Sequence, residues 1–300
     1  MSGAPRLAVV VVSFEARETL LAGLLALREQ ASFPLELVVV DNASTDGSAD
    51  AVRARHPEAV VLANGDNVGF ARACNQGWRA TRAPHVLFLN PDAEVTPGAL
   101  ETLVGLLESR PAVGAAGPRT RGSDGTIQVS TGPDLTPPAE FRQRRLVLGV
   151  ARREARALAE AEALHAREHE PAWVSGSCLV ARRTALEAVG GFDERFFLYE
   201  EDADLCRRLR EAGWHVVFTP AAEVKHHLGR SMSKAPARAR LEYHRSHLLY
   251  YRKHNGPLSR AALRIHLAAR GGAGWLAATV SGDAPGRSDA GTLLRLALGR

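Results

Sequence analysis

Short apolar runs alternate with helix-like segments over the first 118 residues. The apolar runs, which we interpret as strands, occupy residues 7–14, 35–41, 59–64, 85–90 and 112–117. The intervening segments have helical patterns near residues 20–28, 47–55, 69–80 and 97–109. Uninterrupted apolar strands that alternate with helices are typical of a parallel sheet covered on both faces. We therefore predict an α/β fold with a mostly parallel central sheet flanked by helices.

Polar residues gather where the predicted strands of this half end. Ser13 and Glu15 follow the first strand, Asp41 and Asn42 the second, and residues 64–67 the third. Sheets of this kind bind ligands at the carboxyl ends of their strands. After the fourth strand, Pro91 fixes a turn from which Asp92 projects. That carboxylate is suited to a hard divalent cation, although it could also cap the following helix.

The pattern changes beyond Pro118. We predict a hairpin over residues 122–130 and a helical, arginine-rich insertion over residues 134–170. Two further strands are predicted, over residues 173–183 and 215–218. A helical, arginine-rich segment follows from about residue 236. We predict a domain over 1–235, divided into halves 1–118 and 119–235, and a C-terminal extension over 236–300. Within that extension we expect a flexible break at 271–277, where GGAGWLA occurs, and a loose region at 282–289.

An acidic helix is predicted in FLYEEDADLCRRLREAGW, residues 197–214. Leu205, Leu209 and Ala212 have the spacing of a buried stripe, and Asp204 is expected to face water. The acids of the first turn, Glu200, Glu201 and Asp202, are favourably placed at the positive end of the helix dipole. Helix capping alone would account for these acids, and a catalytic role is the alternative.

Composition narrows the function classes. The chain is 45% apolar and carries a formal net charge of +5, with no apolar run near the roughly 20 residues of a membrane span. An N-terminus without a signal pattern and three widely spaced cysteines predict a cytoplasmic protein with free thiols. The arginines of 142–156 have no interleaved aromatic residues, which disfavours nucleic acid binding. Because no glycine-rich phosphate loop follows the first strand, a nucleotidyltransferase is disfavoured as well.

Several motifs occur together along the chain. They are VVVVSFEA at 9–16, VVVDNASTDGS at 38–48, NGDNVGFARACNQG at 64–77, LNPDAEV at 89–95, GSCLVARR at 176–183, GGFDERFFLYEEDADLCRRLREAGW at 190–214 and HHLGRSMS at 226–233. In this order and spacing, over about residues 1–233, the chain resembles the family 2 glycosyltransferases of the GT-A fold. Within that family it resembles the bacterial rhamnosyltransferase-type branch.

The resemblance implies a nucleotide-sugar site and a divalent metal, Mg²⁺ or Mn²⁺. The implied donor-binding residues are Ser13, Glu15, Asp41, Asn42, Asn67, Gly69, Phe70, Asn75, Asn90 and Asp92. Asp92 corresponds to the last acid of the family's DxD motif and would bind the metal, while Asn90 stands where the first acid is expected. His226 matches the metal-binding histidine through its spacing to Gly229 and Ser231, and His227 remains an alternative.

The resemblance also implies an inverting transfer in which Asp202 is the base and Glu201 orients the site. Crowded like charges beside aromatic residues should raise the pKa of this base. The implied acceptor-binding residues are Trp173, Gly176 and Asp193, with the arginines of 142–156 nearby. An alternative is a catalytically silent sugar-nucleotide or glycan-binding subunit of the same fold.

The implied partners are a dTDP-rhamnose donor, with UDP-sugars second, and a glycan or polyprenyl-diphosphate-linked acceptor. A net positive charge and the short amphipathic stretch at 261–270 are compatible with peripheral contact at the inner face of the plasma membrane. The sequence leaves the oligomeric state open, a homodimer included.

Overall fold

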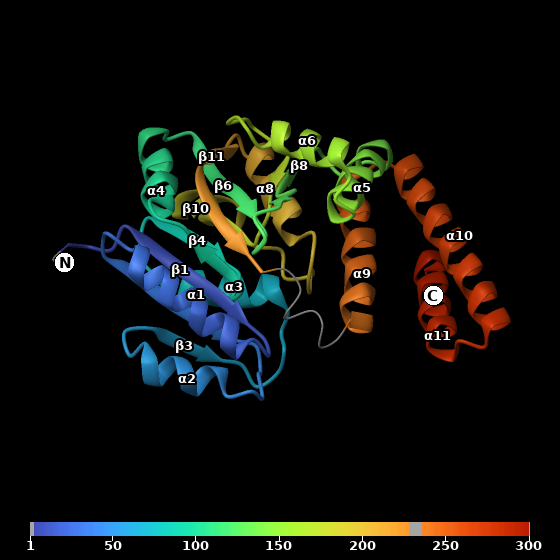
Figure 1. Cartoon of the computed structure of the whole chain (residues 1–300), viewed down its shortest axis with the longest axis horizontal. Helices are drawn as coiled ribbons and strands as arrows, with labels where there is room; N and C mark the ends of the chain where they lie inside the picture. The colour runs from blue at the N-terminus through green and yellow to red at the C-terminus, as the bar shows by residue number, and fades with distance from the viewer. Residues whose placement is uncertain (1–2, 228–235, 300) are drawn as a thin grey trace.

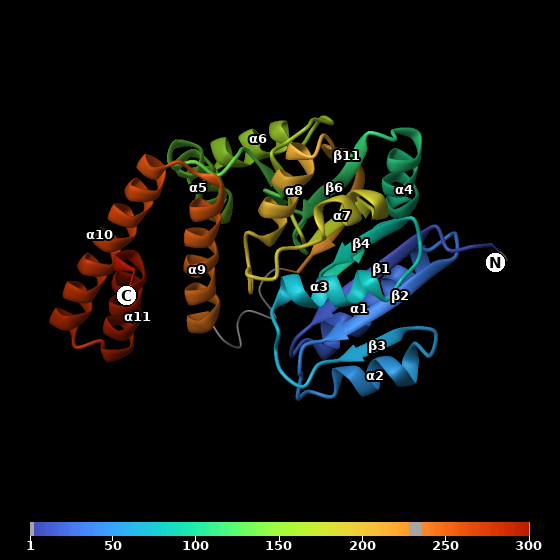
Figure 2. The same cartoon turned by 180° about the vertical axis from the view of Figure 1, so that it is seen from behind.

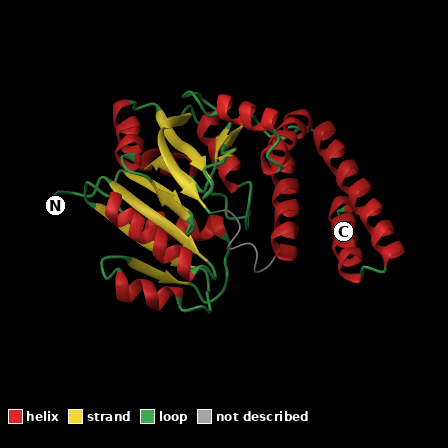
Figure 3. Cartoon of the chain, viewed as in Figure 1, coloured by secondary structure: helices red, strands yellow, loops and turns green. Residues whose placement is uncertain are grey.

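The computed structural model describes residues 3–227 and 236–299, and its main feature is one mixed β-sheet (Figure 3). The order of its strands is β3-β2-β1-β4-β10-β6-β11-β5, with β7 paired to β6. The strands are β1 (Leu7–Ser13), β2 (Leu35–Asp41), β3 (Val60–Ala63), β4 (His85–Leu89), β5 (Ala93–Val95), β6 (Val113–Arg121), β7 (Ile127–Gln128), β10 (Cys178–Arg182) and β11 (His215–His226). An α/β fold with a central sheet is thus confirmed.

The first four strands form the parallel part of the sheet, as predicted. β1 lies between β2 and β4 and pairs with both in parallel register. β10 then runs antiparallel between β4 and β6, so that β6 does not continue the parallel series directly. Strands from both sequence halves therefore alternate in one sheet. This order brings the candidate site residues of the two halves to a common edge.

Helices cover both faces of this sheet (Figures 1 and 2). On one face lie α1 (Arg17–Gln30), α2 (Ser48–Arg55) and α4 (Ala99–Ser109), which pack leucines such as Leu24 and Leu103 against the strands. On the other face lie α3 (Phe70–Arg79), α7 (Arg183–Val189) and α8 (Glu201–Glu211), packed around Phe88, Phe192 and Phe196. The two layers hold the strand ends in fixed positions.

The predicted helical insertion consists of two helices. They are α5 (Pro137–Ala151) and α6 (Ala155–Leu164), and they are separated at Arg153, whose φ of 57° ends the first helix. A separate two-stranded sheet, β8 (Thr131–Gly132) with β9 (Trp173–Val174), joins the start and the end of the insertion. The insertion is thereby tied back to the strand that leads into β10.

The C-terminal extension is formed by α9 (Pro236–His254), α10 (Pro257–Ser281) and α11 (Ala284–Leu298). The predicted break at 271–277 is wrong, because α10 is continuous there. A Cβ on Gly271 would lie 2.9 Å from the backbone N of Leu294, so this glycine permits close packing of α11 against α10. The predicted loose region is wrong too: Gly282 and Asp283 form a short turn, and Asp283 accepts a hydrogen bond from Gly286 N.

Two predictions for the faces of α8 are wrong. Asp204 is fully buried rather than exposed, and Ala212 is exposed rather than part of the buried stripe. Asp204 is buried because α9 covers it: Lys253 Nζ and His254 Nε2 lie 2.6 and 2.7 Å from Asp204 Oδ1. Gly213 follows the helix with a φ of 86°, the left-handed conformation that commonly ends helices.

Candidate active site

The carboxyl ends of β1 and β2 place two buried polar groups side by side. Ser13 and Asp41 are register partners at the last position of their strands. Within the part of the chain that the structure describes, Ser13 Oγ and Asp41 Oδ1 are buried without a hydrogen-bond partner. A buried polar group without a partner costs free energy on the order of 1–3 kcal/mol. This edge is therefore prepared for a polar ligand.

The loops that follow these two strands are fastened to each other. Glu15, at a φ of 52°, accepts hydrogen bonds at Oε1 from Thr45 N at 2.6 Å and from Thr45 Oγ1 at 2.9 Å. Asn42 donates from Nδ2 to Gly69 O at 3.2 Å, which connects the same edge to the loop before α3. Glu15 and Asn42 thus shape the edge on which Ser13 and Asp41 lie.

The loop before α3 packs against the chain that leads into α8. Asn67 Oδ1 accepts a hydrogen bond from Gly69 N at 3.1 Å, and Phe70 N donates to Phe197 O at 2.7 Å. Gly69 has a φ of 88°, and a Cβ at this position would lie 2.6 Å from Phe197 O. Glycine is required here, because a Cβ would clash with Phe197 O. The contact joins the strand edge to the acidic segment that begins α8.

Asn75 is a donor-binding prediction that the structure does not favour. Its side chain is 1% exposed, donates to Phe192 O at 2.8 Å and accepts from Phe192 N at 3.0 Å and Trp78 Nε1 at 3.0 Å. These bonds occupy both polar atoms of the amide. Asn75 therefore holds the segment at Phe192 in place and does not face the strand edge.

Asp92 and His226 meet at the opposite end of the same edge. His226 ends β11, which pairs with β5, and its Nε2 lies 3.2 Å from Asp92 Oδ1 and 3.3 Å from Asn90 Nδ2. His227 points elsewhere, with its Nε2 at 3.0 Å from Glu94 Oε1. The geometry thus favours His226 over His227 as the partner of Asp92. Gly229 and Ser231, which carried the spacing, lie outside the described residues.

These side chains are compatible with a divalent cation that completes its coordination with ligand oxygens. Residues 3–227 and 236–299 contain no group of three or more His, Cys, Asp or Glu side chains arranged to hold a metal. A carboxylate, an imidazole and the amide oxygen of Asn90 suit Mn²⁺ or Mg²⁺, and such ions commonly join one or two carboxylates to substrate phosphates. Asp92 and His226 fit this kind of shared site.

Asp202 is the second residue of α8, follows a strained turn and faces Gly176. Tyr199 and Glu200 have φ values of 70° and 63°, a region that costs non-glycine residues energy and is common at functional sites. Asp202 Oδ2 accepts a hydrogen bond from Gly176 N at 2.8 Å, and Oδ1 accepts one from Ala203 N at 2.8 Å. Burial raises the pKa of Asp202 to about 6, and the charge of Glu200 adds to the rise.

Glu201 lies beside Asp202 in a deeper position. It is 5% exposed, and burial, with the charge of Asp202 second, raises the pKa of its carboxyl well above the usual range. Its Oε2 is a further buried atom without a hydrogen-bond partner among the described residues. The rise in pKa expected for these acids is present, with burial rather than like charge as its first cause.

The predicted acceptor residues differ in their surroundings. Gly176 contacts Asp202, as described, whereas Trp173 Nε1 donates to Pro133 O at 3.1 Å at the rim of the two-stranded sheet. Asp193 pairs with Arg195 Nη2 at 2.6 Å and with Lys253 Nζ at 2.7 Å, and these bonds lower the pKa of its carboxyl. The carboxylate of Asp193 is therefore occupied by ion pairs, which favours a structural role over acceptor binding.

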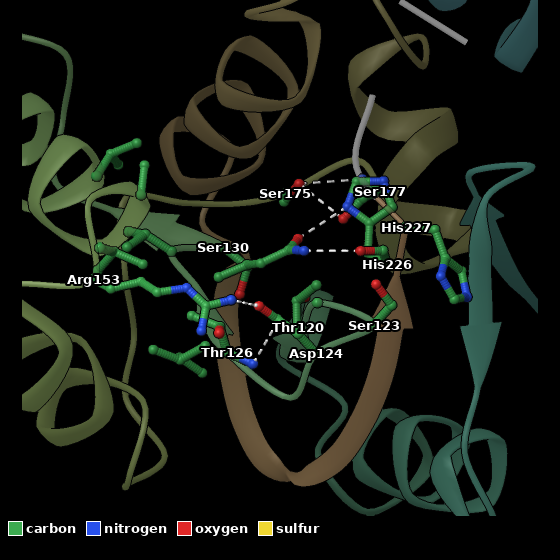
Figure 4. Close-up of a pocket in the computed structure, with 17 residues that line it drawn as sticks. Thr120, Ser123, Asp124, Thr126, Ser130, Arg153, Ser175, Ser177, His226 and His227 are labelled. Atoms are coloured by element: carbon green, nitrogen blue, oxygen red, sulfur yellow. Dashed lines mark hydrogen bonds and ion pairs between the residues drawn. The ribbon is translucent and has the colours of Figure 1, made fainter. Parts of the chain in front are cut away.

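A cavity of about 610 Å³ opens beside His226, and the sequence did not indicate it (Figure 4). Its lining includes Gln128, Ser175 and Ser177 near His226, and Val147 and Val150 of α5. These residues come from the predicted hairpin, the segment before β10 and the insertion, which are distant in sequence. The cavity thus has a polar end at His226 and an apolar wall on α5.

Gln128 is a further site residue that sequence reasoning missed. Its Oε1 lies 3.1 Å from His226 Nδ1, and its Nε2 donates to His226 O at 2.8 Å. The imidazole is therefore oriented with Nε2 toward Asp92. The sequence predicted the hairpin that contains Gln128. It did not indicate that this hairpin would contact β11.

α9 contributes a second group of residues that the sequence did not predict near the site. His247 lies between two carboxylates, with Nδ1 at 3.0 Å from Glu200 Oε1 and Nε2 at 3.2 Å from Glu140 Oε1. Burial alone would lower the pKa of His247, but its hydrogen bonds to Glu140 and Glu200 raise it to about 9. A protonated His247 therefore joins α5 and α9 to the turn before Asp202.

Comparison with known proteins identifies the family of the chain. The model of the glycosyltransferase-like family 2 matches residues 5–242, which is most of the chain. The chain belongs to this glycosyltransferase family. The match spans the strand edge, the Asp92–His226 pair and the start of α8, whereas His247 lies beyond its last residue.

The relatives of this glycosyltransferase include a rhamnosyltransferase. An N-acetylglucosaminyl-diphospho-decaprenol L-rhamnosyltransferase of Mycobacterium tuberculosis is 35% identical over 272 residues, which cover 86% of this chain and 88% of the relative. Among solved structures, the mannosyltransferase PcManGT from Pyrobaculum calidifontis, in complex with GDP-Man and Mn²⁺, has a TM-score of 0.58 and 23% identity, covering 98% of this chain and 81% of that one.

A third similar protein is TarS of S. aureus, residues 1–349 in complex with UDP-GlcNAc. It has a TM-score of 0.56 and 17% identity, and the match covers 88% of this chain and 71% of that one. At these identities the two structures establish the fold, which is GT-A. The glycosyltransferase described here is thus a GT-A enzyme with rhamnosyltransferase relatives.

Proposed function

We propose that this enzyme transfers rhamnose from dTDP-rhamnose to a polyprenyl-diphosphate-linked acceptor, with inversion at the anomeric carbon and with a divalent metal. The observation that carries the proposal is the pairing of two sites on one sheet edge. Asp92 and His226 form one, and Asp202, held by Gly176 N at 2.8 Å, forms the other. A transferase needs both a place for the leaving diphosphate and a base for the acceptor hydroxyl.

Asp202 is the general base of the proposed reaction. Its carboxylate takes the proton of the acceptor hydroxyl as that oxygen forms a bond to the anomeric carbon. The bond between the anomeric carbon and the diphosphate breaks, and its electron pair leaves with the nucleotide. A single displacement of this kind inverts the anomeric centre. A pKa of about 6 leaves Asp202 ionised at neutral pH yet more basic than an ordinary aspartate.

The leaving diphosphate is stabilised at the Asp92–His226 pair. Asp92 is 6% exposed and His226 is 8% exposed, so both side chains are largely shielded from water. A divalent cation bound there, Mg²⁺ or Mn²⁺, supplies Lewis-acid stabilisation of the diphosphate charge. Asn90 and Gln128 fix the orientation of His226 through the contacts at 3.3 and 3.1 Å.

The nucleoside is assigned to the edge formed by Ser13 and Asp41. Their unpartnered buried atoms can accept and donate hydrogen bonds to a pyrimidine base, while Glu15, Asn67 and Gly69 shape the surrounding loops. The rhamnosyltransferase relative favours dTDP-rhamnose as donor, with a UDP-sugar as the second choice. Neither nucleotide is excluded by the residues at this edge.

The acceptor is assigned to the 610 Å³ cavity beside His226. The Mycobacterium tuberculosis relative is named for an acceptor in which N-acetylglucosamine is joined through a diphosphate to decaprenol. An apolar wall with Val147 and Val150 and a polar end with Ser175 and Ser177 suit such an amphiphilic molecule. Gly176 lies between the two serines and contacts Asp202, which brings the acceptor hydroxyl toward the base.

A panel of sugar nucleotides tests this proposal. Thermal-shift binding and donor hydrolysis are measured with dTDP- and UDP-sugars, with Mg²⁺, with Mn²⁺ and with neither, on wild type and Asp92→Ala. We expect metal-dependent stabilisation by dTDP-rhamnose that Asp92→Ala loses. His227→Ala is the matched control, because His227 pairs with Glu94 instead, and it should keep most of the stabilisation.

The same experiment addresses the alternative of a catalytically silent binding subunit. A silent subunit would bind a sugar nucleotide or glycan but would neither hydrolyse the donor nor transfer sugar when a GlcNAc-diphosphate lipid is added. Binding without turnover under every metal condition would favour it. The retained Asp92, His226 and Asp202, each held by a specific contact, support the enzyme.

A further inference from the structure

The outer face of α10 carries an exposed apolar stripe. Leu258, Ile265, Leu276 and Val280 are 87%, 70%, 61% and 90% exposed, and Ala262 and Ala269 are exposed between them. These six residues recur at three-, four- and seven-residue intervals, which places them on one side of a helix. The helix has 25 residues and a length of about 37 Å. Large apolar side chains in such a row usually mark an interaction surface.

The opposite face of α10 is already packed. Leu263, Leu267, Gly271 and Ala278 are its buried residues, and Gly271 lies against the backbone of α11. α10 therefore cannot roll to bury the stripe without breaking its contact with α11. The stripe is a fixed surface at the end of the molecule that lies away from the N-terminus (Figure 1).

The charge of the C-terminal extension indicates what this surface contacts. Residues 236–300 contain eleven Lys and Arg and three Asp and Glu, whereas residues 1–235 contain 27 basic and 30 acidic residues. The net positive charge of the chain thus resides in the extension. α10 itself contains Arg260, Arg264 and Arg270 and no acidic residue. An exposed apolar stripe within a strongly cationic helical extension is the pattern expected of a helix that lies in an anionic membrane surface.

We infer that the α10 stripe docks this glycosyltransferase on the surface of an anionic lipid bilayer, with the helix lying in the interface plane. The inference rests on the proposed function for its purpose, because an acceptor on a polyprenyl chain is held in the bilayer. Within residues 3–227 and 236–299, no helix combines the length and the apolar character needed to cross a membrane. A second copy of the chain is the other candidate occupant, but it would bring two cationic extensions together.

α10 is joined to the catalytic helix through α9. Lys253 and His254 near the end of α9 bind Asp204 of α8, and His247 binds Glu200 in the turn before it. Pro257 then begins α10 only three residues after His254, the last residue of α9. Docking α10 on a bilayer would thereby orient Asp202 and the acceptor cavity relative to the lipid surface, rather than merely tether the enzyme.

Co-sedimentation with lipid vesicles tests the inference in the full chain. The vesicles are phosphatidylcholine alone, or phosphatidylcholine with about 30 mol % phosphatidylglycerol to provide anionic charge. The variant Ile265→Glu with Leu276→Glu places two charges in the stripe. The matched control, Leu25→Glu with Val60→Glu, places the same charges at exposed apolar residues of α1 and β3. No sugar nucleotide is added, so the result does not depend on catalysis.

We expect wild type and the control to bind the anionic vesicles, and the stripe variant to bind at least about tenfold more weakly. Binding to neutral vesicles should be weaker, and salt should reduce binding to the anionic ones. Because both stripe positions are exposed, the variant should keep the thermal midpoint of wild type. Leu258→Glu with Val280→Glu repeats the test at the two most exposed positions, in case the first variant fails to fold.

Equal vesicle binding by wild type and a folded stripe variant would overturn the inference, as would a wild type that does not bind anionic vesicles. A wild type that is dimeric in light scattering and becomes monomeric with the stripe substitutions, without vesicle binding, would assign the stripe to a second copy. Transfer to a soluble short-chain acceptor, measured in parallel, separates failure of the docking surface from failure of the proposed function.

Discussion

Asp202 and Asp204 lie on two faces of the first turn of α8, and their pKa values are shifted in opposite directions. On the face toward the site, Asp202 accepts hydrogen bonds from the backbone N–H groups of Gly176 and Ala203, and burial raises its pKa to about 6. On the face toward α9, burial would also raise the pKa of Asp204, but His254, Arg208 and Lys253 outweigh it and lower that pKa. Residues two positions apart thus have pKa values shifted in opposite directions.

This difference shows that burial alone does not determine the role of an acid. Both carboxylates are withdrawn from water, and what separates them is whether cations surround them. Without these cations, Asp204 would be a second acid of raised pKa beside Asp202. The cations that the sequence of α8 lacks are supplied by α9, about fifty residues later.

Loss of the carboxylate on the site face should have the largest effect. In Asp202→Asn the acceptor hydroxyl has no base, and we expect the transfer rate to fall by about 10²–10⁴-fold. Donor binding, which we assign to Ser13, Asp41 and the Asp92–His226 pair, should change little. Steady-state transfer assays and thermal-shift titration with the donor measure both. A rate within threefold of wild type would assign the base to another residue.

Loss of the carboxylate on the α9 face should act on stability instead. Asp204→Asn leaves Lys253 and Arg208 without their anion, and we expect a loss of about 2–3 kcal/mol in the free energy of unfolding. The value is below the roughly 3–5 kcal/mol of a broken, fully buried pair because the side chain of Lys253 is 21% exposed. Urea unfolding gives the measurement. If Asp204→Asn lost activity like Asp202→Asn while keeping its stability, the two faces would not differ as described.

The pH dependence of the rate should follow the carboxyl on the site face. Asp202 must be ionised to act as a base, and its pKa is about 6. The transfer rate should therefore be constant well above pH 6 and fall about tenfold for each unit below it. A pH–rate profile at saturating substrates measures this. An acid limb near pH 4, the value for an ordinary aspartate, would show that Asp202 is not the titrating group.

The substitution Asp202→Asn, which should remove activity, should also increase the free energy of unfolding. Because the folded pKa of Asp202 lies above the unfolded value near 3.9, its ionisation opposes folding as the pH rises from about 4 to 6, and the penalty is complete above 6. At pH 7.5 we expect the free energy of unfolding of Asp202→Asn to be about 1 kcal/mol higher than that of wild type. Urea unfolding at pH 7.5 and pH 4 checks it, and the gain should vanish at pH 4.

The smallest effect should come from the residue that connects α9 to the turn before Asp202. His247→Gln removes the positive charge between Glu140 and Glu200, so the charge of Glu200 acts more strongly on Asp202. The acid limb of the pH–rate profile should shift upward by less than about one unit. His247 faces Tyr243, Tyr251 and His244, with Arg144 and Arg270 nearby. A downward shift would contradict this coupling.

The parallel strands and their polar ends could be predicted from the sequence, because both depend on local pattern. Apolar runs such as 7–14 and 35–41 formed strands, and Ser13 and Asp41 followed at their ends, where the topology of a parallel sheet brings them together. Asp92 and His226 are 134 positions apart, yet the family motifs sufficed to propose them as partners. The 3.2 Å contact between them is consistent with that proposal.

The parts that could not be predicted depend on contacts distant in sequence. Asp204 was expected in water because the periodicity of α8 says nothing about Lys253. The break expected at 271–277 ignored α11, against which Gly271 packs. β10 lies between β4 and β6, and Gln128 contacts His226. Both arrangements arise from pairings that no local pattern indicates.

The measurement that tests the central claim most directly is sugar transfer from dTDP-rhamnose to a GlcNAc-diphosphate polyprenol, with Mg²⁺ or Mn²⁺, by wild type, Asp202→Asn and Asp204→Asn. The account predicts metal-dependent rhamnosyl transfer by wild type, its loss in Asp202→Asn, and its retention in the folded fraction of the less stable Asp204→Asn. Transfer at wild-type rates by Asp202→Asn, or donor binding without any transfer by wild type, would contradict it.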